Sequence, residues 1–278
     1  MKSERKAASK STSPAVAALL LTVLASGSLL RPGPAAAAPP ASAQAGFGTI
    51  KGRLVWGGSS APESPLLIKQ GDATVKDAAV CAAADLRSQE LVVDPATLGV
   101  RYGFAYLNRP AGTNPEAQQA ALAQQATVEI DQKNCAFIPH CTALLKDQAL
   151  VFKSSDPVGH NVRYSGFTNA SNNVALPPQG QLQVKLVAER RPLPLMCDIH
   201  PWMKGYMMIF DHPFFAVTGE DGSFEIQGVP AGVQKLVVWQ EKVGYVNQGA
   251  GLGMSVTVQP GQTTDIGTVA IDPAKVKP

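Results

Sequence analysis

The segment MCDIHPWMKGYMM, residues 196–208, leads from a short loop rich in reactive side chains into an apolar strand. Cys197, His200 and Met203 follow one another in steps of three residues, so one turn of chain can aim all three side chains at a single point. A strand is predicted directly afterwards, over residues 205–210, and the neighbouring methionines, Met207 among them, are expected in its core.

The segments around this loop have the pattern of a β-sandwich. From residue 127 onward, short strand-like runs recur, namely ATVEI, QALVFKS, HNVRYSG, LQVKLVA and GYMMIF, separated by turn residues. The composition agrees, because 25 glycines and 22 prolines in 278 residues favour many short strands joined by tight turns. The predicted fold class is all-β.

Strands are also predicted outside this region, at residues 46–57, 100–107 and 253–258. Hairpin turns are predicted at residues 220–222 and 230–232, where Gly follows acidic or Pro residues. Residues 111–126 are rich in Ala and Gln and follow a proline, which favours a linker or a short helix.

The amino terminus has the layout of a secretory signal peptide. Four basic residues precede an apolar run over residues 15–30, and small residues fill positions 35–45, where cleavage after Ala43 and after Ala45 are both compatible with the pattern. The apolar run is interrupted and too weak to predict a stable membrane span. We therefore expect an exported protein, periplasmic or secreted.

Charge argues against a nucleic-acid partner. Residues 1–45 carry a net charge of +4, so the formal +3 of the whole chain falls to −1 when they are removed. Binding to a phosphate backbone requires clustered Lys and Arg, and only Arg190 and Arg191 form a local pair. We expect no nucleic acid among the partners.

The side chains of the quoted loop point to copper. A soft thiolate, an imidazole and a thioether together suit copper in both oxidation states, and the set is usually completed by a second imidazole. His160, in the stretch SSDPVGHNVRYSG, is the candidate for that fourth ligand. The predicted copper ligands are therefore His160, Cys197, His200 and Met203.

On these residues, the stretch 127–211 resembles the cupredoxins, with the short Cys-x2-His-x2-Met ligand loop of the amicyanins. The resemblance implies one type 1 copper, with Cys197 as the thiolate ligand, His160 and His200 completing a trigonal plane, and Met203 as a weak axial ligand. Counting to the longer spacing of plastocyanins would reach Gly205, which offers no side-chain ligand.

The resemblance also assigns residues around the copper. Asn161 matches the family's Asn after the first His, whose side chain ties that strand to the loop following the Cys. Asp198 departs from the Ser or Thr often found there, and would place a negative charge near the copper. His200 would be the exposed ligand, with Pro201 and Trp202 forming an apolar docking surface.

The flanking segments resemble a different family, the carboxypeptidase regulatory-like (transthyretin-like) β-sandwich, in GTIKGRLVW and in TGEDGSFEIQGVPAG. In the sequence, these segments precede and follow the cupredoxin-like stretch. That stretch is therefore predicted to be inserted in a second sandwich or to pack beside it. The whole arrangement resembles exported bacterial proteins labelled methylamine-utilisation proteins. The predicted divisions are a signal peptide (1–45), the two halves of the second sandwich (46–115 and 212–274), a linker (116–126) and the cupredoxin domain (127–211).

Three cysteines remain beside Cys197, which allows at most one intramolecular disulfide in an oxidising compartment. If Cys135 and Cys141 lay on one extended strand, they would be roughly 20 Å apart, too far for a bridge. Cys81 is then a partner for either, and Cys81 with Cys135 is the preferred pair.

Two histidines remain, His140 and His212. A second metal site formed by them is one alternative, but each lies next to Pro, and surface positions are expected for both. Oxidases and copper nitrite reductases need further His-rich sites, so an enzyme is not expected. The leading hypothesis is transfer of single electrons between redox proteins, such as a c-type cytochrome or a dehydrogenase. Alternatives are copper binding and delivery, or a structural β-sandwich protein whose copper site is incidental.

Overall fold

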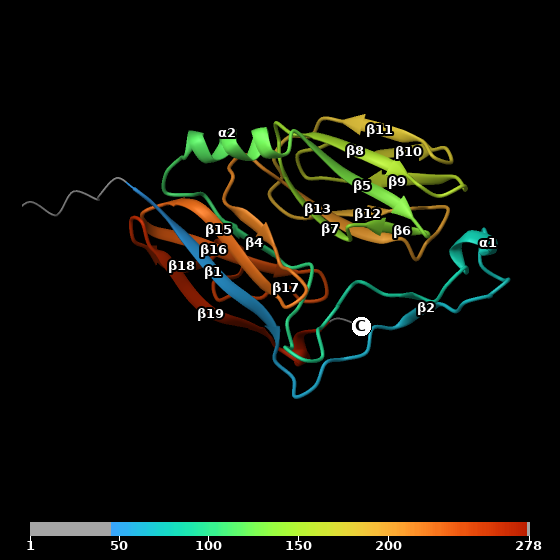
Figure 1. Cartoon of the computed structure of the whole chain (residues 1–278), viewed down its shortest axis with the longest axis horizontal. Coiled ribbons are helices and arrows are strands. Elements are labelled where there is room, and N and C mark those ends of the chain that lie inside the picture. Colours follow the sequence, from blue (N-terminus) through green and yellow to red (C-terminus); the bar gives the residue numbers. More distant parts are fainter. Residues whose placement is uncertain (1–45, 277–278) are drawn as a thin grey trace, which may run out of the picture. The chain divides into compact units, whose positions relative to one another are not determined.

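The computed structural model describes residues 46–276, all within one compact unit, Ser42–Pro278. Nearly all regular structure in this part of the chain is β-strand, arranged in several sheets (Figure 1). The predicted all-β sandwich class is confirmed. The predicted signal peptide lies outside the described residues. None of the described helices is long and apolar enough to cross a membrane.

The first sandwich contains the predicted metal ligands. One sheet has four strands in the order β11 (Gln181–Val184), β8 (Ala149–Ser154), β5 (Thr127–Lys133) and β6 (Ala136–Ile138). The other has five strands in the order β10 (Asn172–Leu176), β9 (His160–Tyr164), β12 (Leu193–Met196), β13 (Lys204–Phe210) and β7 (Cys141–Leu145). Side chains such as Ile130, Phe152 and Met207, all fully buried, fill the space between them.

The second sandwich draws strands from both sides of the first one in sequence. Its three-stranded sheet has the order β15 (Ser223–Pro230), β1 (Phe47–Trp56) and β19 (Thr263–Ile271). Its other sheet has the order β14 (Phe215–Val217), β4 (Phe104–Leu107), β16 (Gly232–Gln240) and β17 (Gly244–Tyr245), and β18 (Met254–Val258) pairs with β16. Ile50, Leu54 and Val238 lie in a core of their own.

A third apolar cluster joins the two sandwiches. Met208 and Phe210 on β13 pack with Tyr106 on β4 and Val237 on β16, and the rings of Tyr106 and Phe210 are 5.2 Å apart. Contact between these residues buries large apolar side chains on the outer face of the five-stranded sheet. Helix α2 (Pro115–Gln124) occupies the stretch predicted as a linker or short helix.

Part of the segment between β1 and β4, residues 66–87, packs onto the first sandwich (Figure 1). It contains β2 (Leu66–Ile68), paired with β3 (Leu86–Arg87), and the short helix α1 (Ala78–Cys81). Ile68, Cys81 and Ala82 are buried in the core of the first sandwich. We call residues 66–87 the cover segment. The remaining regular elements are two short 3-10 helices, Ala250–Leu252 and Pro273–Lys275.

Candidate metal centre

The loop 197–203 is a tight connection between two antiparallel strands. Strand β12 ends at Met196, which pairs with Lys204 at the start of β13. Within the loop, Met203 N–H donates to the His200 carbonyl at 2.9 Å and Cys197 N–H donates to the Met203 carbonyl at 3.3 Å. These bonds fold the loop back on itself, so its three predicted ligands are held at one end of the sandwich.

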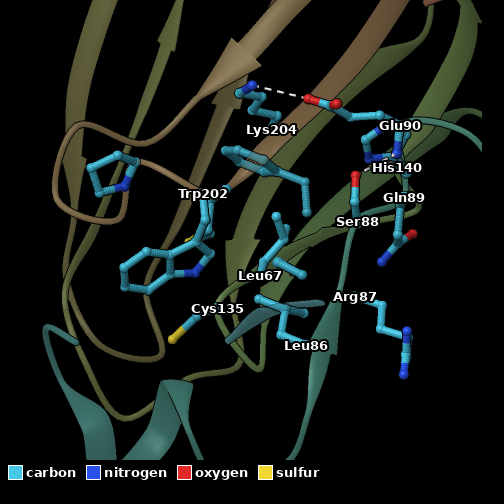
Figure 2. A pocket seen from close by; sticks show the side chains of 14 residues that line it. Leu67, Leu86, Arg87, Ser88, Gln89, Glu90, Cys135, His140, Trp202 and Lys204 are labelled. Carbon is cyan, nitrogen blue, oxygen red and sulfur yellow. Dashed lines mark hydrogen bonds and ion pairs between the residues drawn. The ribbon is translucent and has the colours of Figure 1, made fainter. Parts of the chain in front are cut away.

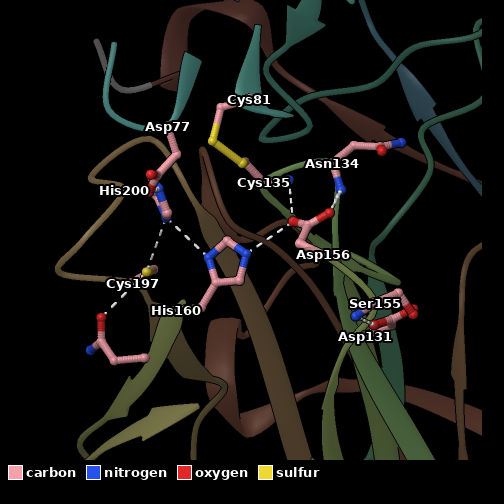
Figure 3. Close-up of polar contacts among 11 residues, drawn as sticks. Asp77, Cys81, Asp131, Asn134, Cys135, Ser155, Asp156, His160, Cys197 and His200 are labelled. Carbon is pink, nitrogen blue, oxygen red and sulfur yellow. Dashed lines mark hydrogen bonds and ion pairs between the residues drawn. A yellow bond between two sulfur atoms is a disulfide. The ribbon is translucent and has the colours of Figure 1, made fainter. Parts of the chain in front are cut away.

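His160, at the start of β9, meets this loop. Its Nδ1 atom lies 3.0 Å from Nδ1 of His200. Cys197 Sγ lies 3.8 Å from that His200 nitrogen (Figure 3). At most 2 % of any of these three residues is exposed, and their donor atoms all lie within 4.8 Å of one another. Met203, 1 % exposed, is buried in the same core. The structure thus brings His160, Cys197 and His200 to one buried place, and it buries Met203 in the core of the same sandwich.

The second nitrogen of each imidazole contacts a carboxylate. His160 Nε2 lies 2.9 Å from Asp156, which also accepts backbone N–H bonds from Asn134 and Cys135 at 2.7 and 2.9 Å (Figure 3). His200 Nε2 lies 3.0 Å from Asp77 in the cover segment. A carboxylate on Nε2 fixes the ring's orientation and favours the tautomer that leaves Nδ1 free to bind a metal. Neither Asp was predicted from the sequence to have a role at the site.

Cys197 and His160 shift each other's pKa. Burial raises the pKa of Cys197, but hydrogen bonds with His160 and His200 outweigh burial and bring it down to about 6. Burial lowers the pKa of His160, but hydrogen bonds with Asp156 and Cys197 outweigh burial and raise it to about 9. The metal-free site therefore favours a thiolate beside an imidazolium.

This donor set fits copper. A thiol with a pKa brought close to neutrality loses its proton to a metal easily, and the two inward nitrogens belong to rings that are already oriented. Soft sulfur ligands and imidazole are the ligand types that copper prefers. The fit rests on donor chemistry and burial, and ligand roles for these four residues remain predictions.

Asn161 ties β9 to the loop after Cys197. Its Oδ1 accepts N–H bonds from Asp198 at 2.7 Å and Ile199 at 3.3 Å, and it lies 3.3 Å from Cys197 Sγ. The Asp198 carboxylate turns outward, where it lies 2.6 Å from Nε of Arg163. Its charge is therefore partly neutralised at the surface rather than aimed at the sulfur.

The expectation of an exposed His200 is wrong. His200 is fully buried, because Asp77 and the disulfide-linked Cys81 of the cover segment lie against it. Pro201 is exposed, but Trp202 is half-buried against the core, with its ring 5.2 Å from that of His200. A docking surface at these two residues would therefore not include the His200 edge.

A disulfide joins the cover segment to the first sandwich. Cys81 and Cys135 are bonded, with their Cα atoms 5.2 Å apart, which is the pair preferred from sequence. The premise that Cys135 and Cys141 share one extended strand is wrong. Cys135 lies in the turn between β5 and β6, whereas Cys141 opens β7 in the other sheet. The bridge lies beside the two inward-facing histidines (Figure 3).

The remaining histidines differ from their expected surface positions. His140 is 3 % exposed and contacts Glu241, which is also buried. His212 is half-buried, and burial lowers its pKa. Nδ1 of the His212 ring accepts a hydrogen bond from the backbone N–H of Phe214.

No protein-family model and no curated protein matches the chain. Among solved structures, an amicyanin variant in its reduced Cu(I) form matches with 14 % identity and a TM-score of 0.28, over 30 % of this chain and 82 % of that one. A second is amicyanin from Paracoccus versutus, with 11 % identity and a TM-score of 0.27, over 30 % of this chain and 81 % of that one. A third is a copper nitrite reductase from Thermus scotoductus, with 15 % identity and a TM-score of 0.28, over 30 % of this chain and 22 % of that one.

Proposed function

We propose that the chain is an exported electron-transfer protein of the cupredoxin type, with one type 1 copper held by His160, Cys197, His200 and Met203. The observation that carries the proposal is the meeting of Cys197 Sγ with two imidazole Nδ1 atoms at a buried point. Bound copper would supply a one-electron couple, Cu(II)/Cu(I).

The residues around the ion would keep electron transfer fast and would protect the copper from side reactions. Asp156 and Asp77 hold the two rings from outside, so the ligands need not reorient between the oxidation states. Asn161 restrains the thiol and the backbone that follows it. The cover segment excludes water, which removes an open coordination position at which a substrate would react. This closure favours electron transfer over catalysis or copper delivery.

Architecture and location form part of the proposal. We infer a cupredoxin domain at residues 127–211 inserted into a regulatory-like sandwich formed by 46–115 and 212–274, with 116–126 as the connection. Support comes from β1 and β4, which pair with strands that follow residue 212. A disulfide is expected of an exported protein, and periplasmic or secreted redox proteins would be the partners.

Copper titration followed by voltammetry tests the proposal. The mature protein should take up one equivalent of Cu(II) at this site, develop intense visible absorption from thiolate-to-copper charge transfer, and show a reversible one-electron wave. A copper chelator should remove the ion slowly, because the site is closed. Absence of the visible band, or rapid loss of copper without a reversible wave, would argue for storage or delivery instead.

A further inference from the structure

A second buried group of metal-ligating side chains lies outside the proposed copper centre. His140 and Cys141 stand at the start of β7 in the first sandwich, and Glu241 directly follows β16 in the second. Only 3 % of His140 and of Cys141 is exposed, and 6 % of the Glu241 side chain. Three donor atoms, one from each residue, lie within 4.8 Å of one another. His140 Nε2 and a Glu241 carboxylate oxygen are in direct contact.

We propose that His140, Cys141 and Glu241 form a second metal site, for Zn²⁺, that links the two sandwiches. Imidazole, thiolate and carboxylate are the three side-chain ligand types of zinc, and three protein ligands with a fourth position for water is a common arrangement. The donors come from two segments 100 residues apart, so an ion there would connect β7 to the end of β16. This inference does not rest on the proposed copper function.

Charge selects a divalent ion for this buried place. With Cys141 as thiolate, Glu241 ionised and His140 neutral, the ligands carry two negative charges, which a 2+ ion neutralises. A neutral site costs far less to bury than one with a net charge. A monovalent ion such as Cu(I) would leave one negative charge without compensation, and the carboxylate is a poor ligand for so soft an ion.

The metal-free cluster is held together by the hydrogen bond between His140 and Glu241, in which the two side chains share a proton. Burial, together with the nearby carboxylate of Glu241, keeps the pKa of the Cys141 thiol well above its ordinary value, so the thiol retains its proton. An incoming divalent ion would displace two protons, the one on the thiol and the one between His140 and Glu241, and would occupy the place of the His140–Glu241 contact. Two metal-free groups held together by a hydrogen bond are thereby converted into ligands.

A route to the cluster exists at His140. A cavity of about 120 Å³ is lined by His140, Ser88, Glu90 and Lys204, among others (Figure 2). Its rim carries an ion pair in which Lys204 Nζ lies 2.9 Å from Glu90 (Figure 2). The cavity has room for water, which both an entry path and a fourth ligand require.

Cobalt binding to a Cys197→Ser variant tests the site. The chain has four cysteines and two form the disulfide, so this variant leaves Cys141 as the sole free thiol. Co²⁺ serves as the visible probe for Zn²⁺. We expect one equivalent to bind with a sulfur-to-cobalt charge-transfer band, and Zn²⁺ to displace it. Adding Glu241→Gln should lower the Zn²⁺ affinity by about 100-fold or more, whereas the control Glu129→Gln, at an exposed position of β5, should leave it unchanged.

A Cys141→Ser/Cys197→Ser double variant, checked for native circular dichroism, should lose the sulfur band altogether. The proposal is overturned if folded Cys197→Ser protein binds no Co²⁺, or binds it without the sulfur band. It is equally overturned if the band appears but Glu241→Gln leaves the affinity unchanged. In each of those cases the cluster would be a buried His–Glu pair that only joins the sandwiches.

Discussion

Two buried Cys–His clusters in one chain place their thiols in opposite environments. At the first, Cys197 lies beside two imidazoles, and hydrogen bonds from them bring its pKa down to about 6 despite burial. At the second, Cys141 lies beside one imidazole and a carboxylate, and burial together with Glu241 raises its pKa well above the ordinary value. Burial is common to both, so the neighbouring groups decide whether a thiolate is prepared in advance.

The two clusters also differ in the groups that contact the nitrogens of their imidazole rings. Both histidines of the first have a carboxylate on the outward nitrogen, which leaves Nδ1 directed inward. In the second, the carboxylate itself belongs to the cluster. Under the two proposals, the first cluster would hold an ion whose ligands must not move, and the second would hold an ion that balances two negative charges.

The largest expected effect breaks the covalent link that only the first cluster has. Replacing both Cys81 and Cys135 by Ser removes a bond across 54 residues, which should lower the free energy of unfolding by about 4 kcal/mol in the chain-entropy model. Urea titration of metal-free protein measures it. The control, Cys141→Ala, closes no loop and should cost about 1 kcal/mol. Equal losses would mean that the disulfide does not restrain the cover segment.

A pH effect follows from the opposed shifts at the first cluster. Cys197 has its folded pKa lowered to about 6, so its contribution to stability is lost as pH falls through that value. His160 has its folded pKa raised to about 9, so its contribution is lost as pH rises through that value. Because one pKa falls from 9.0 to about 6 while the other rises from 6.5 to about 9, the folded and unfolded states bind nearly the same number of protons, and the free energy of unfolding of metal-free protein should change little between about pH 6.5 and 9.

Free energies of unfolding measured by urea across this range give the test. The free energy of unfolding of Cys197→Ser should fall as pH rises through this range, because Asp156 still raises the pKa of His160 and no thiolate offsets the loss, whereas Cys141→Ser should stay as flat as wild type. A Cys197→Ser protein whose stability did not fall would show that His160 and Cys197 do not offset each other.

Copper-loaded protein should separate two neighbouring methionines. Met203→Leu should retain copper and raise its reduction potential, because loss of a weak donor disfavours Cu(II) more than Cu(I). Met207, fully buried in the core of the first sandwich, is the matched control, and Met207→Leu should leave the potential nearly unchanged. Voltammetry that found the larger shift in Met207→Leu would exclude Met203 as the axial ligand.

The smallest expected effect compares two aspartates near the first cluster. Asp77→Asn removes a negative charge in contact with His200 and should raise the copper potential by on the order of tens of millivolts. Asp198→Asn should do less, because Arg163 already neutralises that carboxylate at the surface. A larger shift in potential from Asp198→Asn than from Asp77→Asn would contradict the expectation that Asp77 has the greater influence on the copper.

The candidate metal-binding loop could be predicted from sequence because its chemistry is local. Cys197, His200 and Met203 sit on one turn, and His160 begins a strand with a recognisable pattern. Asp156 lies only four residues before His160, so a carboxylate that orients the His160 ring was detectable from the sequence. Asp77 was not, since it is 123 residues from His200 in a polar segment without periodicity.

Strand prediction failed where a residue contradicts strand propensity. Strand β12 contains Pro194, which argues against a central strand, yet β12 pairs with both β13 and β9. Strand β19 was missed because polar residues open it and Gly267, at a φ of 70°, interrupts it. In both, partner strands and burial supply what local propensity lacks.

The most direct test of the account is the visible absorption of three proteins after one equivalent of Cu(II). Wild-type protein and Cys141→Ser should both turn blue, because Cys197 supplies the thiolate-to-copper charge transfer. Cys197→Ser should remain without that band, since a hydroxyl cannot replace the thiolate. A blue Cys197→Ser protein beside a colourless Cys141→Ser protein would contradict the assignment of the copper centre.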